Sequence, residues 1–554
     1  MRNYLISICV LILSGFSLSA QDVERPLPQG WDELVTGGRF IDRFKAMPST
    51  CKPSSETWGA DAVKPRIICN GLEDDAWSYW GGNIVKGNDG KFHLFVCRWR
   101  EDSPKGHMQW PSSQVVHAIC DNTIGPFQVV DSIGKGHNPE IQQLSDGRYF
   151  IYVNDFAGDA YYLSNSLYGP WEKYAFEYDQ RGRPIFDHMA NLTFAKREDG
   201  SFLMVCRGGG IWISETGLPP YYQVSEKSAY PPFEGKYEDP VVWRTNIQYH
   251  MIVNDWLGRI AYYLRSKDGI HWKLDEGEAY APGIAFHENG IKEDWYKFER
   301  IKMFQDEYGR ATQANFAVCD TIKKQDKGSD NHSSKNISIP LTVGRLISIL
   351  DTDTINDDTK TIDVLVKAED VFNPHKDINL KSLRFGASEE VDYGRGAKVK
   401  ATRKQGDDLV ITFEAKGNGL TEANFVAKLL GKTRRGDLLF GFARLPWLNY
   451  NQAALSASYP TFSLNSKKLK VDIELQNFGQ VKSENSKLLI EVFKDGKWIK
   501  LGESVIASIA PYQKSTITLH KSKFANRGEV ANTRVTIFQN NQPPVILEGK
   551  VVIR

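Results

Sequence analysis

The chain repeats one pattern of two β-strands joined by a tight turn, and this repeat restricts the fold more than any other feature of the sequence. An apolar strand, a turn that is Asp-Gly in three copies, and a second apolar or aromatic strand recur at residues 83–97, 139–153, 191–206 and 239–253, with a looser copy at 298–319. The copies begin roughly 50 to 60 residues apart, a spacing typical of repeat architectures. Alternating apolar segments around Asp-Gly predict β-hairpins.

A second hairpin follows each of the first four copies, at residues 115–130, 160–174, 211–224 and 261–274. Two hairpins per repeat give four strands, which is the content of one propeller blade. The repeats therefore predict a five-bladed β-propeller over residues 76–320. A stacked array of sandwiches explains the repeat less well, because each copy lacks the seven strands that a sandwich needs.

The predicted fold class is all-β, with the five-bladed propeller followed by two β-sandwich domains. A chain of 554 residues is too long for one core. Residues 21–75 form an irregular lead-in, in which Trp31–Met47 favours a short amphipathic helix. The polar residues 321–336 indicate a linker. Strand patterns with period two then predict a β-sandwich over 337–450 and an immunoglobulin-like domain over 451–554.

The first twenty residues have the pattern of a signal peptide. Arg2 supplies a positive charge, Tyr4–Phe16 is apolar, and Ser17–Ala20 is rich in small residues. Cleavage near Ala20 predicts an exported protein, periplasmic or extracellular. The apolar run is too short to span a bilayer, and no later stretch reaches ~20 apolar residues, so no membrane span is expected.

Six cysteines remain after this segment. Export permits disulfides, and Cys51 and Cys69 are close enough in sequence for a local bridge. Cys97, Cys206 and Cys319 lie inside apolar strand patterns, which favours buried hydrophobic residues. No Cys/His spacing of a zinc site occurs, so no metal ligands are predicted. A net charge of +1 gives no field for nucleic acid or an anionic membrane.

Polar residues recur where the first strand of each repeat begins. In a propeller these strands line the central channel, so equivalent positions from several blades meet at one open face. The candidates from the five repeats are Trp80, Asn83, His137, Asn138, Glu140, His188, Asn191, Glu238, Asp239 and Arg300. Carboxylates, imidazoles, amides and one guanidinium thus converge from distant parts of the chain.

Cleavage of a glycosidic bond normally needs two carboxyl groups with unlike pKa values. Glu238 is the candidate general acid, because the charge of Asp239 beside it would raise its pKa. Turn capping at the strand start is the structural alternative for Glu238, and Asp239-Pro240 is also a common turn starter. Glu140 is a candidate base or orienting carboxylate.

The other candidates fit substrate binding. His188 and His137 suit proton transfer, substrate binding or an ion in the channel, or they are buried hydrogen-bonded histidines. Arg300 suits an anionic sugar, or it pairs with its neighbour Glu299. Trp80 and Trp256 are candidate stacking platforms, although most Trp residues in blades belong to the core.

These residues carry a resemblance to the five-bladed propellers of glycoside hydrolase family 43 and its secreted relatives. The similar segments are 57–71, 78–99, 112–127, 136–153, 237–243, 249–253, 266–272 and 298–312, and 382–398 resembles the sandwich that often follows such propellers. The resemblance implies a carbohydrate-active enzyme with an acid glutamate that matches Glu238. The family's basic aspartate belongs at the start of the first blade, where this chain has Ser78–Asn83 and no acid.

Three functions follow from these observations. The first is a secreted, exo-acting glycoside hydrolase on oligosaccharides from plant or algal polysaccharides. The second is a non-catalytic carbohydrate-binding propeller, because the first-blade acid is missing. The third is a polysaccharide lyase, with His or Tyr removing a proton beside a uronate held by Arg. No cofactor is required, a calcium or similar ion in the channel is left open, and no oligomeric state is predicted.

Overall fold

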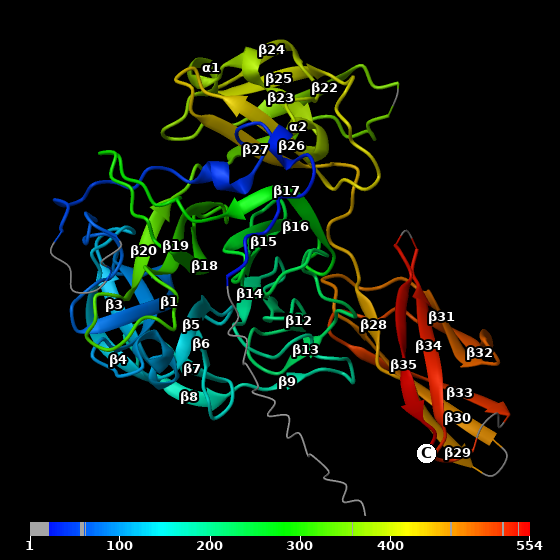
Figure 1. Cartoon of the computed structure of the whole chain (residues 1–554). Coiled ribbons are helices and arrows are strands. Elements are labelled where there is room, and N and C mark those ends of the chain that lie inside the picture. The colour runs from blue at the N-terminus through cyan, green and yellow to red at the C-terminus, as the bar shows by residue number, and fades with distance from the viewer. Residues whose placement is uncertain are drawn as a thin grey trace, which may run out of the picture.

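A computed structural model describes residues 22–55, 60, 63–356, 358–465, 468–522, 526–540 and 542–554. The predicted signal peptide at residues 1–20 lies outside this part. Regular structure in it is nearly all β, which confirms the predicted all-β class. Figure 1 shows a large group of sheets, a smaller unit above it around β24 and β25, and a third unit at the C-terminal end. None of the described helices is long and apolar enough to cross a membrane.

Each sequence repeat folds into a sheet of its own. The first contains β1 (Trp77–Lys86), β2 (Phe92–Arg100), β3 (Gln114–Cys120) and β4 (Gln128–Lys135). The second contains β5 (His137–Gln143), β6 (Tyr149–Asn154), β7 (Ala160–Ser164) and β8 (Glu172–Ala175). The third contains β10 (Thr193–Lys196), β11 (Phe202–Val205), β12 (Ile211–Ser214), β13 (Tyr221–Gln223) and, parallel to β13, β9 (Tyr178–Asp179).

The fourth sheet contains β14 (Tyr237–Arg244), β15 (Tyr249–Asp255), β16 (Ile260–Ser266) and β17 (Trp272–Tyr280). The fifth contains β18 (Lys297–Gln305), β19 (Ala311–Cys319) and β20 (Ser334–Pro340). The first strands form a ring: β1 contacts β5 and β18, and β14 contacts β10 and β18. A hydrogen bond from Phe194 N to Glu140 Oε1 joins β10 to β5 and completes it. Five sheets around one axis are the arrangement of a propeller.

The ring has one unusual backbone position per sheet. Gly81, Asn138, Asn191, Asp239 and Arg300 all have positive φ, between 51° and 64°. In the first, second, fourth and fifth sheets this residue lies in a register shift of the first strand. Left-handed conformations are uncommon for residues other than glycine, and they cluster at functional sites. Residues on the two sides of this position therefore reach opposite ends of the channel.

The fifth sheet extends beyond the predicted propeller boundary at residue 320. β20 pairs with β19 from Ser334 to Pro340, so residues 321–333 connect two strands of one sheet and do not link two domains. The polar start of β20 conceals this strand in the sequence. The polar groups of β20 have hydrogen-bond partners inside the fold: Asn336 Nδ2 donates to Gly81 O, and Ser338 N donates to Asn70 Oδ1.

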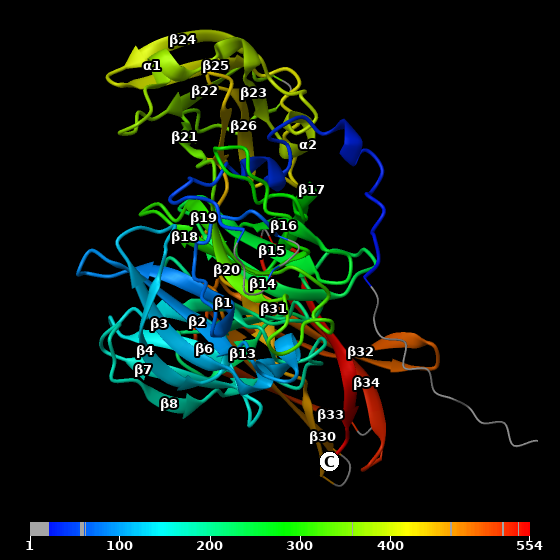
Figure 2. The same ribbon diagram turned by 60° about the vertical axis from the view of Figure 1, so that its left-hand side comes forward.

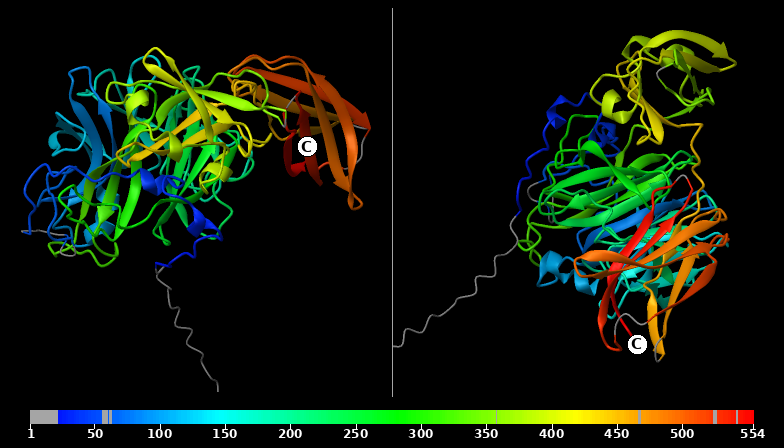
Figure 3. Two further views of the ribbon diagram at one scale, coloured as in Figure 1. Left: turned by 90° about the horizontal axis from the view of Figure 1, so that it is seen from above. Right: turned by 90° about the vertical axis from the view of Figure 1, so that its right-hand side faces the viewer.

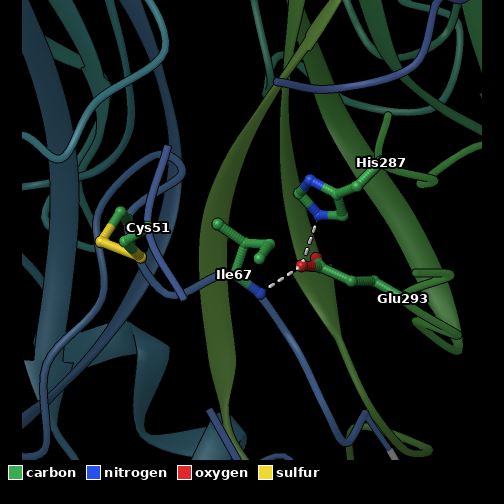
Figure 4. Close-up of a disulfide and its surroundings, with 5 residues drawn as sticks. Cys51, Ile67, His287 and Glu293 are labelled. Atoms are coloured by element: carbon green, nitrogen blue, oxygen red, sulfur yellow. Dashed lines mark hydrogen bonds and ion pairs between the residues drawn. A yellow bond between two sulfur atoms is a disulfide. The ribbon is translucent and has the colours of Figure 1, made fainter. Parts of the chain in front are cut away.

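The lead-in segment is held against the propeller. The predicted disulfide between Cys51 and Cys69 is present, and Figure 4 shows it beside Ile67. Ile67 N and His287 Nε2 both contact Glu293 Oε1, at 2.9 and 2.8 Å. The described cysteines outside this bridge are free, and Cys97, Cys206 and Cys319 are buried as predicted.

The helix expected over residues 31–47 is absent from the described lead-in. Two short 3-10 turns, η1 (Trp31–Glu33) and η2 (Phe40–Arg43), replace it. Gly37 between them has φ +90°, a conformation that ends a right-handed helix. The segment passes between the propeller and the next unit, where Lys428 Nζ donates to the carbonyl oxygens of Gly37 and Gly38.

The unit after the propeller buries one core between two groups of strands that share β21. Its sheet runs in the order β23 (Arg384–Gly386), β26 (Val426–Lys432), β27 (Leu438–Arg444), β21 (Arg345–Ile349), β22 (Thr361–Val366), β25 (Asp408–Glu414) and β24 (Val399–Gln405). Its helices are α1 (Pro374–Asp377), η4 (Leu380–Ser382) and α2 (Ser388–Val391). Figure 2 shows this unit above the propeller, with the lead-in running past α2.

The C-terminal unit consists of two four-stranded sheets that share one apolar core. One contains β28 (Leu455–Ala457), β29 (Thr461–Asn465), β30 (Lys468–Asn477) and β33 (Lys514–Ser522), and the other β31 (Ser486–Lys494), β32 (Lys497–Ile506), β34 (Val530–Phe538) and β35 (Val545–Val552). Figure 3 shows it at one side of the propeller. Arg183 Nη2 donates to Ala457 O at 2.6 Å across this contact. The immunoglobulin-like topology stays a prediction.

Candidate active site

A cavity of about 510 Å³ opens at one end of the propeller channel. Seven of the ten predicted site residues line it: Trp80, His137, Asn138, His188, Asn191, Glu238 and Asp239. They come from the first, second and fourth sheets and from the segment before β10, so the repeat does bring distant polar residues together. Asn83, Glu140 and Arg300 do not line this cavity.

Glu238 is the central carboxyl group of the cavity. Its Oε1 accepts a hydrogen bond from Asn191 Nδ2 at 2.7 Å and lies 3.2 Å from Arg207 Nη1. Burial, together with the negative charge of Asp239, raises the pKa of Glu238 to about 7. Both contacts involve Oε1, so no contact with a described residue holds Oε2. A carboxyl group with this pKa and one free oxygen has the properties of a general acid.

Asp239 lies behind Glu238 and is fixed by its neighbours. Arg300 Nη1 lies 3.0 Å from Asp239 Oδ1, and Arg300 N donates to Oδ2 at 3.3 Å. Asn191 Nδ2 donates to the same Oδ1 at 2.8 Å. Asp239 is 2% exposed. The paired aspartate therefore acts on Glu238 through its charge and through the shared Asn191.

The predicted role of Arg300 in binding substrate is wrong. Its side chain is buried, and its guanidinium pairs with Asp239. Arg300 has the left-handed backbone conformation of its ring position.

The fifth sheet contributes Glu299 to the cavity. Its Oε2 pairs with Lys323 Nζ, whereas its Oε1 is buried and contacts no described hydrogen-bond partner. The charge of Glu299 also helps to raise the pKa of Glu238. The wall of the cavity thus includes a second carboxylate, one oxygen of which has no described partner, although the first sheet has Trp80 at the equivalent position.

The histidines of the cavity differ in exposure. His137 is buried, and burial together with the charge of Arg300 lowers its pKa well below the usual range. Its Nδ1 lies 3.0 Å from Ser113 Oγ. His188 is exposed at the rim, and its Nδ1 lies 2.7 Å from Asp187 Oδ1. His137 is therefore a neutral polar group in the cavity wall, and His188 is a contact at the opening.

The aromatic residues of the cavity are of two kinds. Trp80 is buried, with Lys323 Nζ 4.7 Å from its ring centroid and the ring of His107 edge-on to it. Trp110 and Phe156 lie at the opening with their ring centroids 5.1 Å apart, and Phe156 is 62% exposed. A sugar ring can stack on Trp110 and Phe156 more readily than on the buried Trp80. Trp256 lines the cavity as well.

Glu140 and Asn83 lie at the opposite end of the channel, where they line a second cavity of about 640 Å³. Glu140 Oε1 accepts hydrogen bonds from Phe194 N at 2.8 Å and Thr193 Oγ1 at 3.2 Å, and Oε2 pairs with Lys302. Asn83 is bonded to both backbone groups of Ile141. Each of these side chains ties its sheet to the next, so the predicted catalytic role of Glu140 and the predicted binding role of Asn83 are wrong.

Several cavity residues were not predicted. Arg207 follows β11 and pairs with both Glu238 and Asp187. Lys323 belongs to the connection between β19 and β20, which the sequence indicated as a linker. Asp159, whose pKa burial raises to about 6, follows β6. Only Glu299 had a usable signal, because it directly precedes Arg300 at the fifth repeat position.

Among the residues that the structure describes, no group of three or more histidine, cysteine or acidic side chains is arranged to hold a metal ion. We name no ligands for the calcium ion considered from the sequence.

No protein-family model matches the chain, and no curated protein matches it. Similar solved structures include an α-L-arabinofuranosidase from Lactobacillus brevis, which is 14% identical over 48% of this chain and 90% of that one, with a TM-score of 0.33. A structure described as a glycoside hydrolase is 10% identical over 86% and 95% of the two chains, with a TM-score of 0.33.

The GH43 protein BlXynB from Bacillus licheniformis is 9% identical over 86% of this chain and 89% of its own, with a TM-score of 0.31. Glycoside hydrolase family 43 is also the family that the sequence resembles. At these identities and TM-scores the likenesses assign no activity to this chain. Function has to be argued from the residues of the cavity.

Proposed function

We propose that this protein is a glycoside hydrolase in which Glu238 protonates the leaving oxygen of a glycosidic bond. The observation that supports this role is the pKa of Glu238, raised to about 7 in a cavity that also holds a second carboxylate. Near neutral pH such a group is protonated in a large part of the molecules. It can therefore donate a proton under conditions where an ordinary glutamate is ionised.

Glu299 is the partner carboxylate in this proposal. Its Oε1 has no described partner, and the contact of Oε2 with Lys323 favours the negative charge that a base or nucleophile needs. Glu299 either activates a water molecule, which inverts the sugar, or attacks the sugar carbon, which retains its configuration. The anomer formed first, followed by NMR, distinguishes these reactions. This assignment fills the role of the first-blade acid that the sequence lacks.

We propose an exo-acting enzyme that removes a terminal sugar from oligosaccharides of plant or algal polysaccharides. The cavity volume of about 510 Å³ lies within the ~300–1,000 Å³ of small-molecule sites, so it suits one end of a glycan better than a long chain. Trp110 and Phe156 at the opening offer apolar faces on which the next sugar can stack.

Product release from a panel of such oligosaccharides tests the proposal. Wild-type protein is expected to release a monosaccharide from at least one of them. Glu238→Gln is expected to lower that rate by about 10³-fold, within the range for loss of a general acid. Unchanged circular dichroism and thermal unfolding show that the variant is folded. A folded Glu238→Gln protein with wild-type activity would reject Glu238 as the acid.

The same panel separates the alternatives. Binding without any product would favour a carbohydrate-binding propeller. Release of an unsaturated product, detected by its ultraviolet absorbance, would favour a lyase. The lyase alternative relied on an arginine to hold a uronate, but the guanidinium of Arg300 pairs with Asp239.

We also propose that the protein acts outside the cytoplasm after removal of residues 1–20. The disulfide between Cys51 and Cys69 supports this, because such bonds persist in oxidising compartments. N-terminal sequencing of the mature protein tests it: a sequence that starts near Gln21 is expected, and an intact Met1 would contradict it.

A further inference from the structure

A separate cavity of about 280 Å³ lies where the propeller meets the unit that follows it. Its wall combines η2 of the lead-in, the hairpin of β14 and β15, the start of β21 and part of β27. No residue that lines it also lines the candidate active site. Small-molecule sites occur preferentially at such domain junctions, and they are mostly apolar with a few placed polar groups. The volume is close to the lower end of the ~300–1,000 Å³ typical of these sites.

Arg43 is the distinctive group of this cavity. It is 6% exposed, and its Nε has no hydrogen-bond partner among the described residues. Its guanidinium carbon lies 4.5 Å from the ring centroid of Phe40, 4.4 Å from that of Phe440 and 5.8 Å from that of Phe442. Cation–π contacts offset part of the cost of burying the charge. They leave the Nε–H donor of the guanidinium without a partner among the described residues.

The other positive groups of the wall are neutralised or exposed. Arg310 pairs with Asp306 and Glu369, Arg345 pairs with Glu369, and Lys367 is exposed. No aspartate or glutamate belongs to the part of the wall that the structure describes. Arg43 is thus a buried cation in a positively charged cavity with no anion opposite it. A buried charge without a paired anion is costly to a fold, and a bound anion would remove that cost.

We propose that this junction cavity binds a small organic anion of monosaccharide size, with the acidic group of the ligand on Arg43. A planar guanidinium binds carboxylate and sulfate oxygens through parallel N–H donors. The rings of Trp243 and Phe440 in the wall suit the apolar face of a sugar ring. An acidic monosaccharide combines both features. This site does not depend on the proposed hydrolase activity.

Isothermal titration calorimetry on the full chain tests the proposal, with glucuronate, galacturonate, glucose 6-sulfate and glucose as probes. At least one acidic sugar is expected to bind at least 10-fold more tightly than glucose. Comparing the affinities of the two uronates with that of the sulfated sugar shows which acidic group the site prefers. Arg43→Met, which keeps the packing of the side-chain stem, is expected to weaken that binding at least 30-fold.

Two further variants serve as controls. Lys367→Met removes an exposed charge from the same wall and is expected to change affinity less than 3-fold. Ser348→Trp fills the cavity and keeps Arg43, so it is expected to abolish binding even where Arg43→Met does not fold. The proposal is overturned if wild-type protein binds no acidic sugar more tightly than glucose. It is also overturned if either folded variant, Arg43→Met or Ser348→Trp, binds like wild type.

Discussion

The two ends of the propeller channel each hold a Glu–Lys pair with a buried carboxylate, and the two pairs differ in what else the carboxylate contacts. At the end away from the candidate active site, the far end, Glu140 pairs with Lys302, and its other oxygen accepts hydrogen bonds from the third sheet. At the active-site end Glu299 pairs with Lys323, and its other oxygen has no described partner. The residue types are the same at both ends, but both carboxylate oxygens of Glu140 have partners, whereas only one oxygen of Glu299 does.

This difference separates a structural carboxylate from a reactive one. A carboxylate whose two oxygens both have partners joins two sheets and has no oxygen free to contact a substrate. A carboxylate in the wall of a cavity, with one oxygen free of hydrogen bonds, can accept a proton or attack a carbon. Charge type and repeat position alone do not distinguish the two ends. The hydrogen-bond partners do.

Replacing Glu299 by Gln is expected to have the largest effect on activity. The amide cannot act as a base or nucleophile, so kcat/KM should fall by about 10³-fold, within the range for a general base. Glycan hydrolysis by purified variant measures this. Glu140→Gln is the matched control from the far end, and its activity per folded molecule should stay within about 3-fold of wild type. Equal losses in both variants would contradict the division between the two ends.

Removing the carboxylate at the far end is expected to give the largest loss of stability. Glu140→Ala leaves the ammonium of Lys302 buried and unpaired, which typically costs about 3–5 kcal/mol. Burial already lowers the pKa of Lys302 to about 8. Urea unfolding at pH 7 measures the loss of stability.

The double variant Glu140→Gln, Lys302→Met removes both charges and should recover more than half of this loss. A double variant as unstable as Glu140→Ala would show that the ion pair is not the cause.

The strand pattern of the sequence predicts the all-β class and the five hairpin repeats, because alternation of apolar residues and Asp-Gly turns are local properties. Glu238 and Asp239 were found for a related reason, since their repeat position places them at the channel. β20 was missed because its buried polar residues, such as Asn336, find partners far away in sequence. The same limit explains why Glu140 was assigned to the site, because its partners belong to another sheet.

Lys323 and Arg207 show where prediction from the sequence stops. Neither lies at a repeat position, and each enters the cavity from a connection between strands. Composition marks such connections as polar and gives no direction to their side chains. Their roles depend on which carboxylate lies within reach, and that is decided by the packing of whole sheets.

The pKa of Glu238 predicts an effect of pH on the stability of the fold. Its pKa is about 7 in the folded protein and 4.5 ordinarily, so the folded state binds more protons between these values. Stability from this group is fully present below pH 4.5 and is lost as pH rises through 7, by about 3 kcal/mol at about 1.4 kcal/mol per pH unit.

Glu238→Gln has no carboxyl group to ionise, so its stability does not fall in this way. At pH 9 its free energy of unfolding should exceed that of wild type by up to about 3 kcal/mol, and at pH 4 the two should be nearly equal. Thermal unfolding at the two pH values measures the difference. A stability difference that does not change with pH would refute the raised pKa. Wild-type activity should also decline above pH 7, because the acid is then ionised.

The smallest effect is expected from Lys323→Met, which removes the ammonium from Glu299 and keeps a side chain of similar length. Burial lowers the pKa of Lys323, whereas the negative charge of Glu299 raises it; the pKa is raised on balance, so the charge is present throughout the working range. Without the ammonium the Glu299 carboxylate loses the ion pair that positions it, and kcat/KM should fall by about 10-fold.

Lys324→Met is the matched control, because Lys324 also lines the cavity and has no ion pair with a described carboxylate. Its kcat/KM should stay close to the wild-type value. If Lys323→Met also leaves kcat/KM unchanged, Lys323 only fills space beside Trp80. If kcat/KM falls in Lys323→Met alone, the lysine positions the catalytic carboxylate. The Glu–Lys pair at the active-site end then acts in catalysis, whereas the pair at the far end acts in folding.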